Sequence, residues 1–296
     1  MLKTLFISII LISSAFAGPR EDALAYLNSI QNVDNLSARL DLLSQKFLGL
    51  PYGVGGPLGE GQSGRYDQDP LYRFDRFDCT TYLETIISLA RAMDVQDFEQ
   101  KMNEIRYENG EVDFLKRDHF TDLQWIPLNI ENGILTEING RIVSTNQILI
   151  AEAQIDFGNW LRHIKLDQIR VPNATANDRN QLLLELQSNA PYYPIQTARV
   201  NYISIATLLR NPALIERIPH ASIVNFVRPN WDLTSTLGTH QNISHQAFIF
   251  RKGSVIMLRH ASPTSGAVVE LPFIEYIKKF ENHPTLKGVQ FMQVNL

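Results

Sequence analysis

Helical and strand periodicity occupy different parts of this 296-residue chain. Apolar side chains recur every three or four residues in four early segments, which predicts helices with one buried face. These segments are 21–33, 35–48, 79–93 and 97–107. From about residue 199 the pattern predicts strands at 222–227, 245–250, 254–260 and 288–294, with a late helix at 273–280. Helices followed by a mostly antiparallel sheet indicate an α+β architecture, with the helices packed on the sheet.

The middle of the chain carries a different pattern. Residues 132–172 alternate between β-rich runs and turns, and Asn139-Gly140 is the dipeptide that a β-hairpin favours. Residues 177–188 predict a short helix. We therefore expect a β-rich insertion or substrate-groove region over about 130–195, within a single catalytic domain spanning 18–296.

The first seventeen residues have the composition of a secretory signal peptide. A short basic start, Met1-Leu2-Lys3, precedes an apolar run that ends at Ala15-Phe16-Ala17. The run is too short to span a bilayer comfortably. We expect cleavage after Ala17, a secreted or periplasmic product and no stable membrane insertion; an uncleaved anchor is the alternative.

Charge and composition narrow the functional classes. The net charge of −4 argues against a protein that follows nucleic-acid phosphates. His119, near Asp118 and Asp122, matches no known metal-ligand spacing, so a groove wall or a loop staple is favoured over a metal site. Trp125, Trp160 and Trp231 could stack on a sugar, but core packing is the favoured interpretation. We expect a monomer without metal or cofactor.

Cys79 is the only cysteine, which is unusual for an exported protein. It is either a small packed residue or a nucleophile. Asp78 could cap a helix that begins at Cys79, or Thr81 could be the cap, with Glu84 completing a capping box. In either case a helix start is expected to stabilise a thiolate and lower the pKa of Cys79. The same free N–H groups could stabilise an oxyanion.

Two histidines occupy mirrored positions in the predicted hairpin 245–260. With Lys252-Gly253 as the turn, His245 and His260 would be directly opposed on one face of the sheet. His260 would then accept a hydrogen bond from Nδ1–H of His245 and orient it as the base for Cys79. A register shift of one residue would instead place them on opposite faces.

Several motifs resemble one family. Phe77-Asp78-Cys79-Thr80-Thr81-Tyr82-Leu83-Glu84 carries the resemblance, supported by the stretches 46–52, 105–107, 117–120, 238–239, 244–245 and 259–262. From about residue 35 onward the chain resembles the N-acetylmuramoyl-L-alanine amidase-like family, a branch of the NlpC-like papain-fold hydrolases. Thr80 after the cysteine and Gln246 after His245 depart from the wider superfamily, in which smaller residues are common.

The resemblance implies a papain-like fold and cleavage of the amide between N-acetylmuramic acid and L-alanine in peptidoglycan or muropeptides. It also implies that Tyr52 lies near the nucleophile and that Asp78 helps to hold the substrate. The residues themselves favour a cysteine nucleophile, Cys79, with His245 as base and His260 as third catalytic member, and the resemblance implies that this group acts as an amidase. A stem-peptide endopeptidase acting after γ-D-glutamate and a non-catalytic peptidoglycan-binding module are the alternatives.

Overall fold

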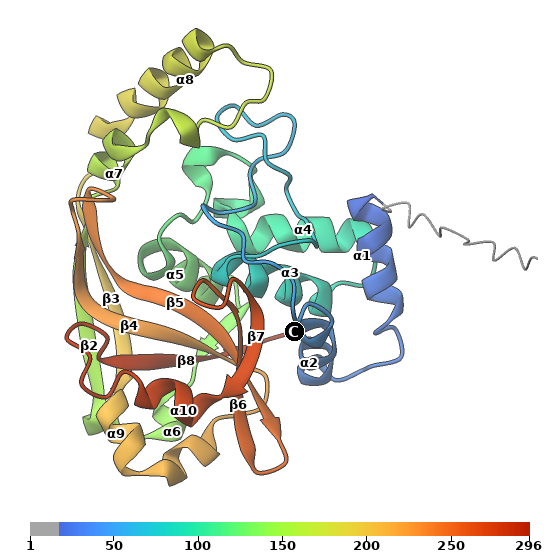
Figure 1. Cartoon of the computed structure of the whole chain (residues 1–296), viewed down its shortest axis with the longest axis vertical. Coiled ribbons are helices and arrows are strands. Elements are labelled where there is room, and N and C mark those ends of the chain that lie inside the picture. Colours follow the sequence, from blue (N-terminus) through green and yellow to red (C-terminus); the bar gives the residue numbers. More distant parts are fainter. Residues whose placement is uncertain (1–17) are drawn as a thin grey trace, which may run out of the picture.

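A computed structural model describes residues 18–296 (Figure 1). The predicted signal peptide, residues 1–17, lies outside the described residues. Within 18–296, every helix is too short or too polar to cross a membrane.

The early helices form where the sequence predicts them. The α-helices are α1 (Pro19–Asn28), α2 (Leu36–Lys46), α3 (Cys79–Arg91), α4 (Val95–Arg106), α5 (Ile126–Glu131), α6 (Asn139–Ile142), α7 (Phe157–His163), α8 (Ala176–Ser188), α9 (Ile205–Arg210) and α10 (Phe273–Lys278). Short 3-10 or π segments are η1 (Glu108–Gly110), η2 (Phe114–Lys116), η3 (Thr121–Trp125), η4 (Thr145–Gln147), η5 (Leu166–Gln168), η6 (Ala190–Tyr192) and η7 (Pro212–Arg217).

One antiparallel sheet collects strands from residue 135 to residue 294. The strands are β1 (Leu135–Glu137), β2 (Ile148–Ile155), β3 (Gln196–Ser204), β4 (Ser222–Leu233), β5 (Thr239–Lys252), β6 (Val255–Ser262), β7 (Ala267–Pro272) and β8 (Gly288–Val294). Their order is β2-β3-β8-β4-β5-β6-β7, and β1 also pairs with β8. The α+β prediction, with helices packed on an antiparallel sheet, is confirmed.

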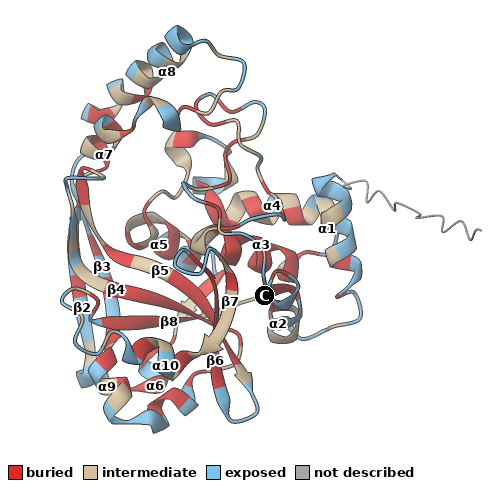
Figure 2. Ribbon diagram, viewed as in Figure 1, coloured by how far each residue is buried: buried red, intermediate tan, exposed pale blue. Residues whose placement is uncertain are grey.

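The sheet separates two apolar cores because successive side chains of a strand point to opposite faces. On β5, Phe248 and Phe250 pack with helices α1–α4, whereas Ala247 and Ile249 pack with α9 and α10. Figure 2 shows the buried residues concentrated on the sheet strands and on α3. The central helix α3 therefore begins against a fully buried part of the sheet, which fixes its position.

The middle of the chain differs from the prediction. It is not a β-rich insertion, because β1 and β2 are part of the main sheet and α6, α7 and α8 contribute more residues than these strands. Asn139-Gly140 begins α6 rather than a hairpin. The buried Asn139 side chain instead donates to the carbonyl of Asn201 and accepts from the N–H of Phe291. Tertiary contacts thus override the local turn preference.

A chain of side-chain amides ties α3 to the strands. Thr80 Oγ1 donates to Gln246 Oε1 at 2.9 Å, and Gln246 Nε2 donates to Asn225 Oδ1 at 2.9 Å. Asn225 Nδ2 donates to Gln290 Oε1 at 3.0 Å, and Gln290 Nε2 donates to Glu137 Oε2 at 3.1 Å. This amide chain joins the start of α3 to β5, β4, β8 and β1 in one register.

Asn225→Ala should destabilise the protein by about 2–4 kcal/mol, because it leaves two buried atoms, Gln246 Nε2 and Gln290 Oε1, without the hydrogen bonds that Asn225 makes. Urea unfolding measures the change. The matched control is Asn201→Ala. Asn201 is exposed and its side-chain amide donates to Glu137, the last member of the amide chain, so its loss should cost less than about 1 kcal/mol. Equal losses of stability in the two variants would show that the amide chain does not hold the strands together.

Candidate active site

The start of α3 is held by a capping box. Asp78 Oδ1 accepts from the backbone N–H of Thr81 at 2.8 Å, and Thr81 Oγ1 accepts from the N–H of Asp78 at 3.0 Å. Asp78 is therefore the cap, and Cys79 is the first residue of the helix. Of the two capping arrangements considered from the sequence, the one with Thr81 as the cap and Glu84 in the box is wrong.

The Cys79 side chain lies between this helix start and strand β5. Its sulfur is 3.9 Å from Thr80 Oγ1, and the backbone N–H of Gln246 is directed at it. The residue as a whole is partly exposed, whereas its thiol is buried. Within residues 18–296, no hydrogen bond joins the sulfur to the ring of His245.

The ionisation of Cys79 differs from the prediction. Burial, and to a smaller extent the neighbouring Asp78 carboxylate, raise the pKa of the Cys79 thiol to about 12. The hydrogen bonds from Gln246 and Thr80 lower it, but by less. Desolvation thus outweighs the helix start, and the expected depression of this pKa is wrong.

His245 and His260 lie on the same face, as predicted, but they are not directly opposed. Strands β5 and β6 pair from Phe248↔Arg259 to Lys252↔Val255, so the turn is Gly253-Ser254 rather than Lys252-Gly253. Moving the turn by one residue shifts the β6 partner of each β5 residue by two positions. Because side chains alternate with a period of two, both histidines stay on the predicted face. The histidines become diagonal neighbours beyond the last pair, with their rings close enough to bond.

The nitrogen that joins the two rings also differs from the prediction. His245 Nε2 lies 2.6 Å from His260 Nδ1, so Nδ1 of His245 is left for other partners. Burial lowers the pKa of His245 to about 3 and that of His260 to about 4. Both rings are therefore neutral near pH 7. If His245 donates through Nε2–H, its Nδ1 is a free base.

Two tyrosines border the sulfur. Backbone hydrogen bonds between Phe77 and the Pro51–Gly53 loop hold Tyr52 beside the start of α3. Burial, Cys79 and Asp78 together raise the pKa of Tyr52 above its ordinary value. Tyr276 of α10 stacks edge-on against His260 at 5.3 Å, and burial and Cys79 raise its pKa to about 12. Nothing in the sequence singled out Tyr276, which occupies an ordinary apolar position of a predicted helix.

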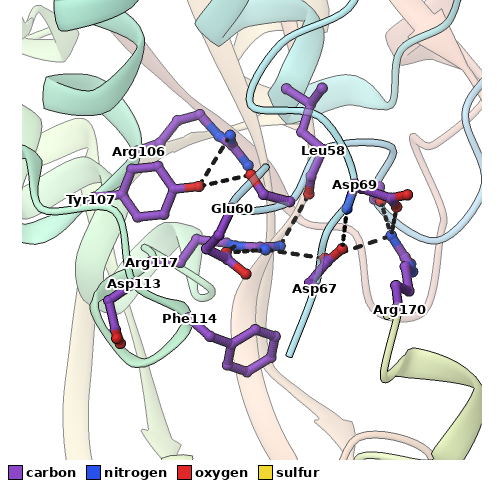
Figure 3. A network of polar contacts seen from close by, with 12 residues as sticks. Leu58, Glu60, Asp67, Asp69, Arg106, Tyr107, Asp113, Phe114, Arg117 and Arg170 are labelled. Atoms are coloured by element: carbon purple, nitrogen blue, oxygen red, sulfur yellow. Dashed lines mark hydrogen bonds and ion pairs between the residues drawn. The ribbon is translucent and has the colours of Figure 1, made fainter. Parts of the chain in front are cut away.

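A first cavity, of about 240 Å³, opens at the start of α3, and we call it the helix-start cavity. Its lining includes Asp78, Thr80, Glu84, Asp118 and three arginines, Arg106, Arg117 and Arg170. Figure 3 shows Arg117 between Glu60 and Asp67, and Arg170 beside Asp69. Arg106 pairs with Glu84 at 3.0 Å. Each arginine of this cavity is thus neutralised by a carboxylate.

A second cavity, of about 580 Å³, lies beside the two histidines, and we call it the histidine-side cavity. His245, His260 and Tyr276 line it together with Trp231 and Arg228. Asp78 and Thr80, the neighbours of Cys79 in sequence, therefore line one cavity, and the two histidines line the other.

The other residues weighed from the sequence have structural surroundings. His119 Nε2 bonds to the carbonyl of Phe114 at 2.7 Å, and its ring lies 4.5 Å from that of Trp160, so it staples a loop. Burial lowers the pKa of His119, which keeps it neutral. Trp125 is fully buried, whereas Trp231 lines the histidine-side cavity.

The fold and the site define a class: an α+β protein with a cysteine at a helix start that borders one cavity and a bonded pair of strand histidines that borders another. The chain belongs to the N-acetylmuramoyl-L-alanine amidase-like (AmiA-like) family, whose family model matches residues 42–285. No curated protein matches the chain.

Solved structures agree with this assignment. A Legionella pneumophila protein described by the family model DUF1460 is 32% identical, covers 94% of each chain and has a TM-score of 0.89. Two structures of an N-acetylmuramoyl-L-alanine amidase from Bacteroides uniformis are 18% and 16% identical. They cover 88% of this chain and 99% of theirs, with TM-scores of 0.60 and 0.57, and therefore show a shared fold.

Iodoacetamide labelling of Cys79 should be slow at pH 6 and should rise about tenfold per pH unit between pH 7 and 9, because a pKa raised to about 12 leaves the thiolate scarce. Mass spectrometry of quenched samples gives the rate. The urea-unfolded chain is the control and should label faster at pH 8, since its thiol regains an ordinary pKa. Fast, pH-independent labelling of the folded protein from pH 6 to 8 would contradict the neutral-thiol assignment.

Proposed function

We propose that this protein is a cysteine hydrolase of papain-like arrangement that cleaves the amide between N-acetylmuramic acid and L-alanine in peptidoglycan or its fragments. The observation that carries the proposal is the bonded pair of His245 and His260 at one cavity, with a second cavity at the helix start that bears Cys79. An amide has two halves, and a cavity at the nucleophile's helix start and another at the base can hold one half each. We further propose that the protein acts outside the cytoplasm, as a monomer and without a cofactor.

Catalysis starts from a thiol and a neutral imidazole. Nδ1 of His245 takes the Cys79 proton as the sulfur attacks the lactyl carbonyl carbon, so charge appears only as the new C–S bond forms. Free N–H groups at the start of α3 stabilise the oxyanion. The hydrogen bond from His245 Nε2 to His260 Nδ1 orients the ring and supports its positive charge, as the third member of a triad does.

Collapse of the tetrahedral intermediate breaks the C–N bond, and His245 passes its proton to the departing alanine nitrogen. Water, deprotonated by the same imidazole, then attacks the thioester. The products are the muramic acid carboxylate, a free alanine amine and the restored thiol. Tyr52 lies near Cys79 and Asp78, and Asp78 lines the helix-start cavity; both residues are proposed to hold the substrate.

Cys79→Ala should abolish cleavage, because the nucleophile is lost. The measurement is a digest of purified muropeptides followed by mass spectrometry, in which an amidase releases the intact stem peptide with a free alanine amine. The helix start tolerates alanine, so circular dichroism should be unchanged. Formation of muramyl-L-alanyl-D-glutamate, with the muramyl amide intact, would identify an endopeptidase instead, and turnover by the variant would refute the nucleophile.

His260→Ala should lower kcat by at least about tenfold, because His245 loses the partner that orients it. His260→Asn is the matched variant, since its amide oxygen can occupy the position of Nδ1 and accept the same hydrogen bond. It should recover a substantial part of the activity while leaving KM close to that of the native protein. Equal losses in the two variants would assign His260 to packing rather than to positioning.

A further inference from the structure

The charged residues of the histidine-side cavity are of one sign. Its lining contains Arg228 and Lys279 but neither aspartate nor glutamate. Within residues 18–296, neither cation takes part in a salt bridge. Arg228 Nη1 donates to Thr285 Oγ1 at 2.5 Å, and its guanidinium lies 4.7 Å from the ring centroid of Trp231.

Arg228 also has unused hydrogen-bonding capacity. Its Nε is buried and has no partner among the described residues. Burial lowers the pKa of Arg228, and the only group that raises it is the Tyr276 phenol. A buried donor without a partner is costly, and a guanidinium fork matches a carboxylate. The site is therefore built to receive an anion.

The two cavities differ in this respect. In the helix-start cavity each arginine already has a carboxylate: Glu84 for Arg106, Glu60 for Arg117 and Asp69 for Arg170. An incoming anion would have to displace these partners. No carboxylate among the described residues lines the histidine-side cavity, so its cations attract an anionic ligand more strongly than those of the helix-start cavity.

The chemistry of the reaction says which half of the substrate enters this cavity. The leaving amine receives its proton from His245, so it must lie on the side of that ring. His245 faces the histidine-side cavity. The leaving group is a stem peptide, and its second residue, γ-linked D-glutamate, carries a free α-carboxylate.

We propose that the histidine-side cavity is the leaving-peptide subsite and that Arg228, assisted by Lys279, binds the α-carboxylate of D-glutamate. This inference rests on the proposed function and deepens it. Trp231, Tyr276 and Phe280 supply apolar walls for the peptide. The assignment makes the protein selective for stem peptides that carry this carboxylate over those in which it is amidated.

The test uses two synthetic muramyl dipeptides, both ending in a γ-methylamide, that differ only in an α-carboxylate or an α-carboxamide on the D-glutamyl residue. The native protein should cleave the acid with a kcat/KM about 10- to 100-fold higher, the range of one charged hydrogen-bonded contact. Arg228→Gln should collapse this preference. Arg228→Lys keeps the charge and should retain part of it, and Lys279→Gln should reduce it less.

Arg199→Gln is the matched control, because Arg199 is an exposed residue of β3 paired with Glu152 and should not affect the preference. A preference that survives in Arg228→Gln, or no preference in the native protein, would overturn the inference while leaving the amidase proposal intact. Cleavage of neither substrate would refute the proposed function.

Titration calorimetry with Cys79→Ala measures binding without cleavage. It therefore tests the carboxylate contact separately from the proposed hydrolase activity. This variant should bind the acid about 10- to 100-fold more tightly than the amide, and the double variant with Arg228→Gln should bind the two equally. Equal binding of acid and amide by Cys79→Ala itself would refute the carboxylate contact directly.

Discussion

The hydrogen bond between Thr80 of α3 and Gln246 of β5 joins the two elements on which the site depends. One neighbour of Thr80 is Cys79, and one neighbour of Gln246 is His245. Because the side chains of Gln246, Asn225 and Gln290 continue as a buried amide chain across the sheet, slippage of any strand would leave polar groups unsatisfied in the core. The position of the thiol relative to the histidines is thus set by the requirement that buried amides be paired, and the Gln246 N–H comes to face the sulfur as a consequence.

Burial around this junction keeps the reactive groups uncharged. Desolvation opposes both the Cys79 thiolate and the His245 imidazolium, so the site holds a thiol and a neutral base. A thiolate–imidazolium pair would be poorly solvated in this buried site. Proton transfer during bond formation instead creates the oxyanion beside the helix N–H groups and the imidazolium beside His260, which can stabilise them. The two cavities also differ in the charge of their lining residues. In the helix-start cavity the arginines are neutralised by carboxylates, whereas the described lining of the histidine-side cavity contains Arg228 and Lys279 without carboxylates.

Much of the arrangement follows from patterns that are local in sequence. The apolar stripe of 79–93 predicts α3, and Asp78 before it predicts the cap, because both depend on residues within one or two turns. The mirrored spacing of His245 and His260 predicts that they share a face, and this survives the error in the turn because a shift of two residues restores the alternation. Asn139-Gly140 misleads because the buried Asn139 side chain bonds to residues more than sixty positions away, which no local rule includes.

By itself the sequence determined the fold class, the helix that begins at Cys79 and the pairing of the two histidines, since these depend on periodicity and short spacings. Only the tertiary structure decided the ionisation of the thiol, the nitrogen through which His245 bonds to His260, and the contribution of Tyr276 and Arg228. Desolvation and cavity charge depend on which distant segments meet around a group. A helix start that would lower the pKa of a solvated thiol is outweighed once the sheet and the Asp78 carboxylate surround that thiol.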